Sequence, residues 1–316
     1  VGDSGGYCQS DGRPPKTNEW GKSMTGNQIQ TVVGLIHQAD AVLVGAGSGL
    51  SSAAGYNHYH NDRNFQTHFG DFEDAYGIQN LFQGFYYLYS KPEQQWGFYA
   101  RYIDFMEKAP AGQPYLALRD VLAGKDHFIL TTNCDAQLPK VFPEERLFQF
   151  QGDFRYFQCS QPCHDKLYDN RDMIASMLNG MDRLEVPADL IPRCPLCGWK
   201  MVPWVQDNTF LQGSEWQAGY QRYEAFVQKY RNKKLLLLEL GVGDMTPSVI
   251  KLPFWDMTAK FPDAFLVTVN QAKSSAPEHL HGRCLTIRDE LSHFMQGLRR
   301  EFYETDGKNN DSESGC

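Results

Sequence analysis

The chain has 316 residues, of which 41% are hydrophobic, so it can bury a sizeable core in one large domain or in a large and a small one. Its net charge of −8 argues against nucleic acid or an anionic membrane as the main partner, because both require a basic surface. No apolar stretch is long enough to cross a bilayer and no signal peptide is visible, so we expect an intracellular protein, cytoplasmic or mitochondrial.

The start of the chain predicts a tail followed by a βα unit. The opening residues are rich in Gly, Ser, Asp and Pro, and we expect a flexible tail at residues 1–24. Apolar residues recur at helical spacing from residue 27 to 38, and a short apolar run follows at 41–44. This order predicts a helix, a strand, a glycine turn at Gly45-Ala46-Gly47 and a second helix that starts near Ser51.

The middle of the chain begins with an aromatic-rich segment. Polar residues separate the aromatic ones from residue 58 to 114, which predicts amphipathic helices packed as an insertion. The apolar run at residues 127–130 then predicts a second strand that ends at the motif TTNCD, residues 131–135. In open α/β sheets, ligands bind at the carboxyl ends of the strands, so this motif is a candidate site.

Two close pairs of cysteines follow, at Cys159 and Cys163 and at Cys194 and Cys197. Tetrahedral zinc needs four soft ligands at about 2.3 Å, and two such turns supply them. We therefore expect a structural zinc ion with no open coordination position. Unrelated buried or redox-active cysteines are the alternative, and His164 could replace one ligand, although a surface histidine is the more common finding.

The α/β pattern returns in the last third. Apolar runs at residues 235–240 and 265–269 predict buried parallel strands, and a final helix is expected from about residue 289 to 302. The expected fold is α/β, a Rossmann-like parallel sheet with a smaller zinc-binding and helical insertion domain. Its expected parts are a Rossmann-like nucleotide-binding domain at 25–57, 115–155 and 233–303, a helical insertion at 58–114, a zinc-binding insertion at 156–232, and flexible tails at 1–24 and 304–316.

The glycine turn alone is weak evidence for a nucleotide. It lets backbone amides approach a pyrophosphate, but position 50 is Leu where the Rossmann spacing has Gly, and no unique acidic partner for a ribose follows. The order of all these motifs, however, resembles that of the sirtuin family from about residue 27 to 300. The macrodomain-linked class M sirtuins are the branch with the most similar stretches: GAGSGLSSAAGY at 45–56, TTNCD at 131–135, QGDFRYFQCSQPC at 151–163 and ELGVGDMTPSVIKLP at 239–253.

The resemblance implies NAD as co-substrate and a set of residues that contact it. Asn133, Asp135 and Gln151 are implied as catalytic, with Asn133 and Asp135 lining the nicotinamide pocket. Arg63 stands in a segment that departs from the sirtuin pattern Pro-Asp-Phe-Arg. The neighbouring His58 and His60 could be functional, although solvated loop histidines are the more common finding. The implied NAD contacts are Gly45, Ala46, Gly47, Leu50, Ser51, Arg63, Thr132, Gly241, Val242, Gly243, Asn270, Gln271 and Ile287.

Gln151 decides which reaction the sequence favours. Sirtuin deacylases carry a His-Gly pair eight residues before the first zinc cysteine, and here Gln151-Gly152 stands at that spacing. Deacylation needs a general base that titrates near neutrality, and a carboxamide does not exchange protons. Cleavage of the nicotinamide bond depends more on positioning and electrostatics, and an acceptor carboxylate is already ionised. The substitution therefore favours ADP-ribosyl transfer.

The class M resemblance implies a protein mono-ADP-ribosyltransferase connected with oxidative stress. Its implied target is a lipoylated carrier similar to the glycine-cleavage H protein, and its implied counterpart is a macrodomain hydrolase that removes the modification. Two alternatives remain open. One is an NAD-dependent deacylase in which His127 or Asp153 serves as the base, and the other is a module that binds NAD or ADP-ribose without turnover.

Overall fold

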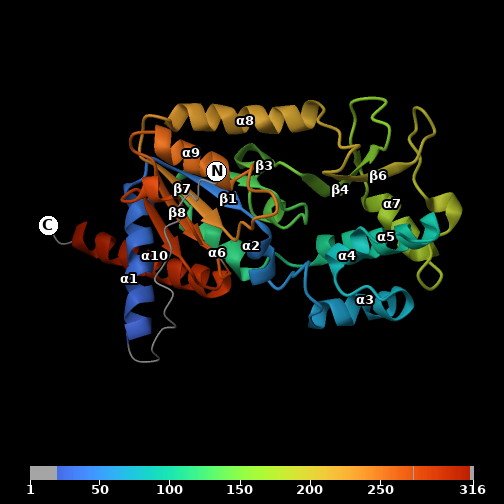
Figure 1. Ribbon diagram of the computed structural model, residues 1–316, viewed down its shortest axis with the longest axis horizontal. Helices are drawn as coiled ribbons and strands as arrows, with labels where there is room; N and C mark the ends of the chain where they lie inside the picture. Colours follow the sequence, from blue (N-terminus) through green and yellow to red (C-terminus); the bar gives the residue numbers. More distant parts are fainter. Residues whose placement is uncertain (1–19, 273, 314–316) are drawn as a thin grey trace, which may run out of the picture.

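A six-stranded parallel sheet forms the centre of the larger part of the molecule (Figure 1). The computed structural model describes residues 20–272 and 274–313, and their side chains from residue 27 to 305. The strand order is β3-β2-β1-β7-β8-β9. The strands are β1 (Ala41–Ala46), β2 (Asp126–Thr131), β3 (Leu147–Gln149), β7 (Leu235–Leu240), β8 (Phe265–Val269) and β9 (Cys284–Ile287).

Helices cover both faces of this sheet. Val42 and Val44 of β1 belong to the core cluster of one face, whereas Ala41 and Leu43 belong to that of the other. Because successive residues of a strand point to opposite faces, burial of both faces requires the continuous apolar runs seen in the sequence. One face carries α1 (Trp20–Gln38), α6 (Gln113–Val121) and α10 (Leu291–Glu313), and the other carries α8 (Ser214–Tyr230) and α9 (Lys251–Lys260) (Figure 1).

The strand order reverses next to β1. The chain runs outward from β1 through β2 to β3, and its later strands β7, β8 and β9 lie on the opposite side of β1. In open parallel sheets, ligands bind outside the carboxyl ends of the strands at such a reversal. The segments that leave β1 and β7 there are the short helix α2 (Ser48–Ala53) and the turn at Gly241.

These two segments touch through glycines. A Cβ atom added to Gly47 would lie 2.5 Å from the carbonyl oxygen of Gly241, and one added to Gly49 would lie 2.7 Å from the Cα of Gly241. Gly241 itself has φ +63°, a left-handed conformation that favours glycine. The expected glycine turn is shorter than predicted, because β1 continues through Gly45 and Ala46 and the helix starts at Ser48 rather than near Ser51.

The smaller part of the molecule combines helices with a three-stranded antiparallel sheet of order β5-β4-β6. The aromatic residues of the helical insertion pack together with Phe154 and Phe157 of β4 in a separate core, as the amphipathic pattern predicts. The elements are α3 (Arg63–Tyr76), α4 (Leu81–Phe85), α5 (Pro92–Lys108), α7 (Arg171–Gly180), β4 (Gly152–Cys159), β5 (Tyr168–Asp169) and β6 (Met201–Val205). Short 3₁₀ turns lie at Leu138–Lys140, Glu144–Arg146, Ala188–Leu190 and Glu278–Leu280.

Several boundaries differ from the sequence-based expectation. Helix α8 lies within the expected zinc-binding segment, yet it packs on β2 and β3 because its aromatic residues face the sheet. Helix α10 continues to Glu313, although its last residues are polar, and α1 already begins at Trp20. The remainder of the two expected tails lies outside the described residues.

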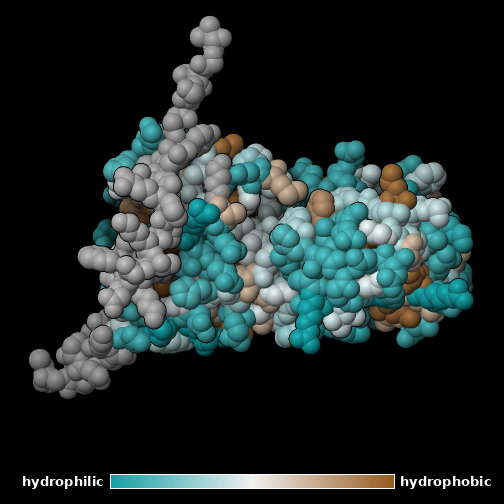
Figure 2. Space-filling view, turned by 60° about the horizontal axis from the view of Figure 1, so that its bottom comes forward, coloured by the Kyte–Doolittle hydropathy of each residue, from teal (hydrophilic) through white to brown (hydrophobic). Residues whose placement is uncertain are grey.

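One face of the molecule is largely polar. Figure 2 shows a face covered mainly by hydrophilic residues, with hydrophobic ones in small patches. Among the helices of the described ranges, none combines the length and the apolar character that crossing a bilayer requires.

The glycine contact can be tested by comparing Gly241→Ala with Gly77→Ala. Both glycines have positive φ, but a Cβ at Gly241 would lie 2.6 Å from the Cα of Gly49, whereas one at Gly77 meets nothing within 4 Å. We expect Gly77→Ala to lower the free energy of unfolding by about 1 kcal/mol through backbone strain. Gly241→Ala should lower it by about 3 kcal/mol, because overpacking adds to the strain. The free energies of unfolding are measured by urea denaturation. Equal losses in the two variants would contradict the close contact between Gly241 and Gly49.

Candidate active site

A cavity of about 300 Å³ lies between the sheet and the helical insertion. Its sheet side comes from the residues that follow β1, β2 and β7, and its other side comes from α4, α5 and the segment before β4. It therefore opens at the strand-order reversal where an α/β sheet binds ligands. Its polar and aromatic lining includes Gly47, His58, Tyr59, Tyr86, Tyr102, Thr132, Asn133, Cys134, Asp135 and Gln151.

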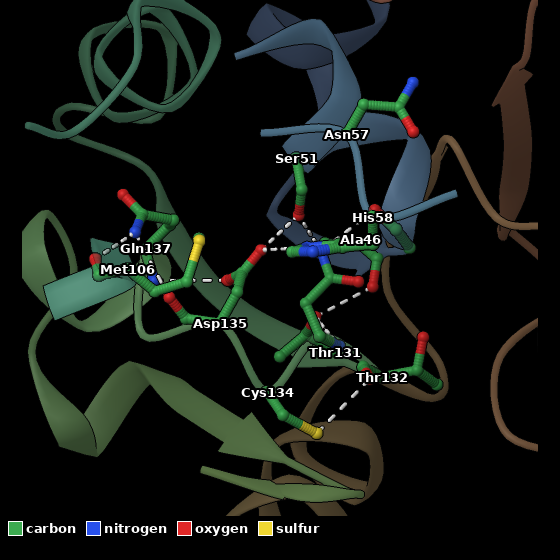
Figure 3. Close-up of polar contacts among 12 residues, drawn as sticks. Ala46, Ser51, Asn57, His58, Met106, Thr131, Thr132, Cys134, Asp135 and Gln137 are labelled. Carbon is green, nitrogen blue, oxygen red and sulfur yellow. Dashed lines mark hydrogen bonds and ion pairs between the residues drawn. The ribbon is translucent and has the colours of Figure 1, made fainter. Parts of the chain in front are cut away.

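Hydrogen bonds fix Asn133 at the end of β2. Its side-chain amide donates to the carbonyl oxygen of Gly47 at 2.9 Å and to Oγ of Ser51 at 3.2 Å. Its own main-chain N–H donates to Oγ1 of Thr131, which in turn donates to the carbonyl oxygen of Ala46 (Figure 3). The amide thus ties the end of β2 to the beginning of α2.

Asp135 is a buried carboxylate with several donors around it. The Ser51 hydroxyl donates to its Oδ2, the main-chain N–H of Gln137 donates to its Oδ1 at 3.2 Å, and Nε2 of His58 lies 3.3 Å from Oδ2 (Figure 3). Burial raises the pKa of this carboxyl, but the contacts with His58, Ser51 and Gln137 outweigh burial and leave the pKa below its ordinary value. Asp135 is therefore ionised at neutral pH.

His58 lines this cavity, so of the two alternatives for it the solvated loop histidine is wrong. Its side chain is 12% exposed, and Nδ1 lies 2.8 Å from the hydroxyl of Tyr102 on α5. The sequence carries no local signal for this position, because Asp135 and Tyr102 are 77 and 44 residues away along the chain. His60, two residues on, lines a different cavity.

Gln151 lines the cavity from the turn between β3 and β4. Its carbonyl oxygen accepts from the main-chain N–H of Gln206 at 2.9 Å and from the thiol of Cys134 at 3.2 Å. Gly152 has φ +92°, and a Cβ there would lie 2.0 Å from the carbonyl oxygen of Trp204, so only glycine fits next to Gln151. Burial raises the pKa of Cys134 well above its ordinary value, which keeps this thiol neutral.

A second cavity of about 430 Å³ is lined by the neighbouring residues Gly49 and Gly241. Asn270 and Gln271, which follow β8, also line it, and the side-chain amide of Asn270 donates to the carbonyl oxygen of Val242 at 3.0 Å. Val242 lines the first cavity. The two cavities therefore lie on either side of the glycine contact between α2 and the end of β7.

Some residues implied as NAD contacts lie away from both cavities. Gly45 and Ala46 are within β1, and Leu50 and Ile287 are buried in the core of the sheet. Ser51 is buried and bonded to Asp135 and Tyr115 rather than lining a cavity. Arg63 is exposed at the start of α3. A direct contact of these residues with NAD remains a prediction.

Neither of the two bases considered for a deacylase lines the first cavity. His127 lies near the amino end of β2, far along the strand from Asn133, and its Nδ1 is 2.8 Å from the carbonyl oxygen of Lys125. Asp153 is buried and forms an ion pair with Arg155 at 2.6 Å. These contacts hold both side chains outside the first cavity.

The four paired cysteines converge at the far end of β4. Their sulfur atoms all lie within 4.8 Å of one another, and the pairs Cys159–Cys197 and Cys163–Cys194 are each 3.6 Å apart. Four thiolates around zinc at about 2.3 Å would be about 3.8 Å apart, so the cluster fits this ion. Nδ1 of His164 lies 3.0 Å from the sulfur of Cys163, which places the histidine beside the cluster as a hydrogen-bond partner.

We expect about one zinc ion per chain in the purified protein, measured by elemental analysis. Cys194→Ser should release the metal and cause loss of folding, because a structural zinc site contributes directly to folding stability. His164→Ala should retain the metal, since the four sulfur atoms complete a tetrahedron without it. Folded protein that contains no zinc would contradict the assignment.

No family model matches the chain. Comparison of its sequence with curated proteins finds two relatives. The chain is 31% identical over 287 residues to a protein ADP-ribosyltransferase of Staphylococcus aureus, which covers 89% of this chain and 90% of that protein. It is 29% identical over 235 residues to a probable bifunctional ADP-ribose hydrolase/ADP-ribosyltransferase of Fusarium oxysporum. That match covers 71% of this chain and 39% of the fungal protein.

Solved structures of sirtuins share the fold. Sir2Tm bound to a propionylated peptide superposes with a TM-score of 0.58 at 16% identity, over 87% of this chain and 98% of that one. A complex of Sir2 with a p53 peptide and NAD+ gives a TM-score of 0.54 at 15% identity, over 86% and 98% of the two chains.

Proposed function

Because the chain belongs to the protein ADP-ribosyltransferases of the sirtuin family, we propose that it transfers a single ADP-ribose unit from NAD to a protein side chain and releases nicotinamide. The observation that carries this proposal is the cavity in which Asn133, the ionised Asp135 and Gln151 meet. Neither Asn133 nor Gln151 exchanges protons, so these residues can orient a substrate but cannot act as a general base.

The two cavities suit the two ends of NAD. We propose that nicotinamide and its ribose occupy the cavity that contains Asn133, and that the adenosine occupies the one beside Asn270. The pyrophosphate would then cross the glycine contact, where the absence of side chains lets backbone amides approach it closely. Ser51 would support this site through Asp135 and Asn133 rather than by touching NAD.

The charge of Asp135 fits the chemistry of nicotinamide release. As the bond to nicotinamide breaks, positive charge develops on the ribose, and a fixed carboxylate at the cavity stabilises that charge. Asn133 and Gln151 would hold the ribose and the nicotinamide amide by hydrogen bonds. An acceptor carboxylate could then attack the ribose without first losing a proton.

Partners and metal follow from the same proposal. A lipoylated carrier as target is supported by the class M resemblance of the sequence alone. An ADP-ribosyl hydrolase as counterpart is also supported by the fungal relative, which is named as a probable bifunctional hydrolase and transferase. The cysteine cluster is proposed to hold zinc, which would stabilise the small sheet without taking part in the reaction.

The proposal can be tested with labelled NAD and a carrier protein, offered with and without lipoylation. Transfer of label to the carrier with release of nicotinamide is the expected result. A deacylated acyl-lysine peptide in a parallel assay would instead indicate a deacylase. Binding of NAD with no release of nicotinamide would indicate a module without turnover.

Asn133→Ala should abolish nicotinamide release and leave the fold intact. Loss of its hydrogen bonds to Gly47 and Ser51 should lower the melting temperature without unfolding the protein, because each such bond contributes only about 1 kcal/mol. Nicotinamide release is measured by chromatography and folding by thermal denaturation. Asn61→Ala, at an exposed site outside both cavities, is the control. Near-normal release by Asn133→Ala would contradict the assignment of the pocket.

Gln151→Ala should lower the rate of transfer on the order of a hundredfold, because misplacing the reacting ribose by about 1 Å has an effect of that size. Gln151→His should give little deacetylation of an acetyl-lysine peptide, because a base alone does not create a site for the acyl group. Robust deacetylation by the wild type would overturn the transferase proposal. Robust deacetylation by the histidine variant alone would refute only the claim about the acyl site.

A further inference from the structure

Three side chains from different elements form a continuous hydrogen-bonded chain at the first cavity. Asp135 follows β2, His58 lies in the loop after α2, and Tyr102 belongs to α5. Nε2 of His58 is 3.3 Å from Oδ2 of Asp135, and Nδ1 is 2.8 Å from the hydroxyl of Tyr102. All three line the cavity together with Asn133 and Gln151.

The charges of the neighbours decide which nitrogen of His58 carries the proton. Asp135 is ionised and can only accept, so the proton of a neutral imidazole belongs on Nε2. Nδ1 is then free to accept the hydroxyl proton of Tyr102. Burial, and then the charge of Asp135, raises the pKa of Tyr102 well above its ordinary value, so the phenol keeps its proton and acts as the donor.

Hydrolases activate a serine with the same order of carboxylate, imidazole and hydroxyl, although here the two ring nitrogens exchange roles.

The other titratable groups that line the cavity do not compete with His58 for the acceptor proton. Burial raises the pKa of Tyr59 after α2, of Tyr86 at the end of α4 and of Cys134 after β2, so these groups stay neutral. Imidazole is the side chain whose charge ordinarily changes between pH 5 and 8.

We propose that Asp135, His58 and Tyr102 form a proton relay that lets this site modify acceptors which still carry their proton, such as a hydroxyl group. The proposal rests on the proposed transfer from NAD. It changes the conclusion drawn from Gln151, because the base lost at that position is replaced by His58 and Tyr102, which line the same cavity from the loop after α2 and from α5.

The bonds and protons of this step balance. The bond from the ribose C1′ to the nicotinamide nitrogen breaks, and its electron pair leaves with neutral nicotinamide. The acceptor oxygen forms the new bond to C1′ and passes its proton to the Tyr102 oxygen, while the phenolic proton moves to Nδ1 of His58. The imidazolium is then paired with Asp135, and it later releases the proton to water.

The tautomer of His58 can be measured without any turnover. Nitrogen-15 NMR of the protein without NAD should show the Nε2–H form, with the His58 signals assigned by their loss in His58→Gln. Tyr102→Phe should shift the Nδ1 resonance, since it removes the donor to that nitrogen and keeps the ring. An Nδ1–H tautomer, or an Nδ1 resonance that Tyr102→Phe does not shift, would overturn the relay.

Two small acceptors separate proton removal from the rest of the reaction. Methanol must lose a proton to attack C1′, whereas acetate does not. In the wild type, the ratio of methanol transfer to acetate transfer reports how well the site removes the acceptor proton. Tyr102→Phe and His58→Gln should lower methanol transfer on the order of a hundredfold, at least tenfold more than acetate transfer. Glutamine is chosen because its amide can still donate to Asp135.

The control is His68→Gln, which removes an exposed histidine of α3 and should keep the ratio of methanol to acetate transfer of the wild type. Equal losses with methanol and acetate in the His58 and Tyr102 variants would mean that these residues only support the fold, and the relay would be wrong. If the wild type releases no nicotinamide with the carrier protein or with either small acceptor, the proposed transfer fails, and the NMR measurement alone decides whether the hydrogen-bonded chain exists.

Discussion

The buried carboxylate of Asp135 is the group on which the arrangement of the site depends. Removing a charged carboxylate from water costs several kcal/mol unless hydrogen bonds replace the lost solvation. Here the replacement comes from Ser51 on α2 and from His58 in the following loop, and Tyr102 of α5 holds His58 in turn. Asp135 can remain ionised only if the sheet, α2 and the helical insertion hold these donors in place at the same time. The position of the smaller part of the molecule relative to the larger part is therefore linked to this one charge.

Features with a local signature could be predicted from the sequence, and features made by distant contacts could not. The apolar runs that became β1, β2, β7 and β8 and the paired cysteines are local patterns, and both were found. The packing of α8 on the sheet has no such pattern, because an amphipathic helix does not specify its partner. Likewise, nothing near His58 in the sequence indicates a carboxylate 77 residues further along the chain.

The glycines at the end of β1 and the start of α2 show that one sequence motif can have two physical reasons. The sequence associated Gly45 to Gly49 with a ligand, but a Cβ at Gly45 would lie 2.3 Å from Ile250, so this glycine serves the packing beneath the sheet. Gly47 and Gly49 are restricted by Gly241 in the same way. The backbones of α2 and of the turn after β7 therefore approach each other closely at the strand-order reversal. Because these positions are glycines, no side chains cover the backbone amides between the two cavities. Packing and ligand access therefore require the same residues.

Strand β4 connects the cysteine cluster to the turn that carries Gln151. The strand begins at Gly152 and ends at Cys159, a span of roughly 23 Å at the usual rise per residue. It pairs with β6 at both ends, with Gly152 opposite Val205 and Cys159 opposite Met201. The cysteine cluster lies at one end of this short ladder, and an irregularity between Asp153 and Phe157 separates that end from the turn. The hydrogen bond from Gln206 to Gln151 continues the pairing of β4 with β6 at the other end, so these two strands join the cysteine cluster to the wall of the first cavity.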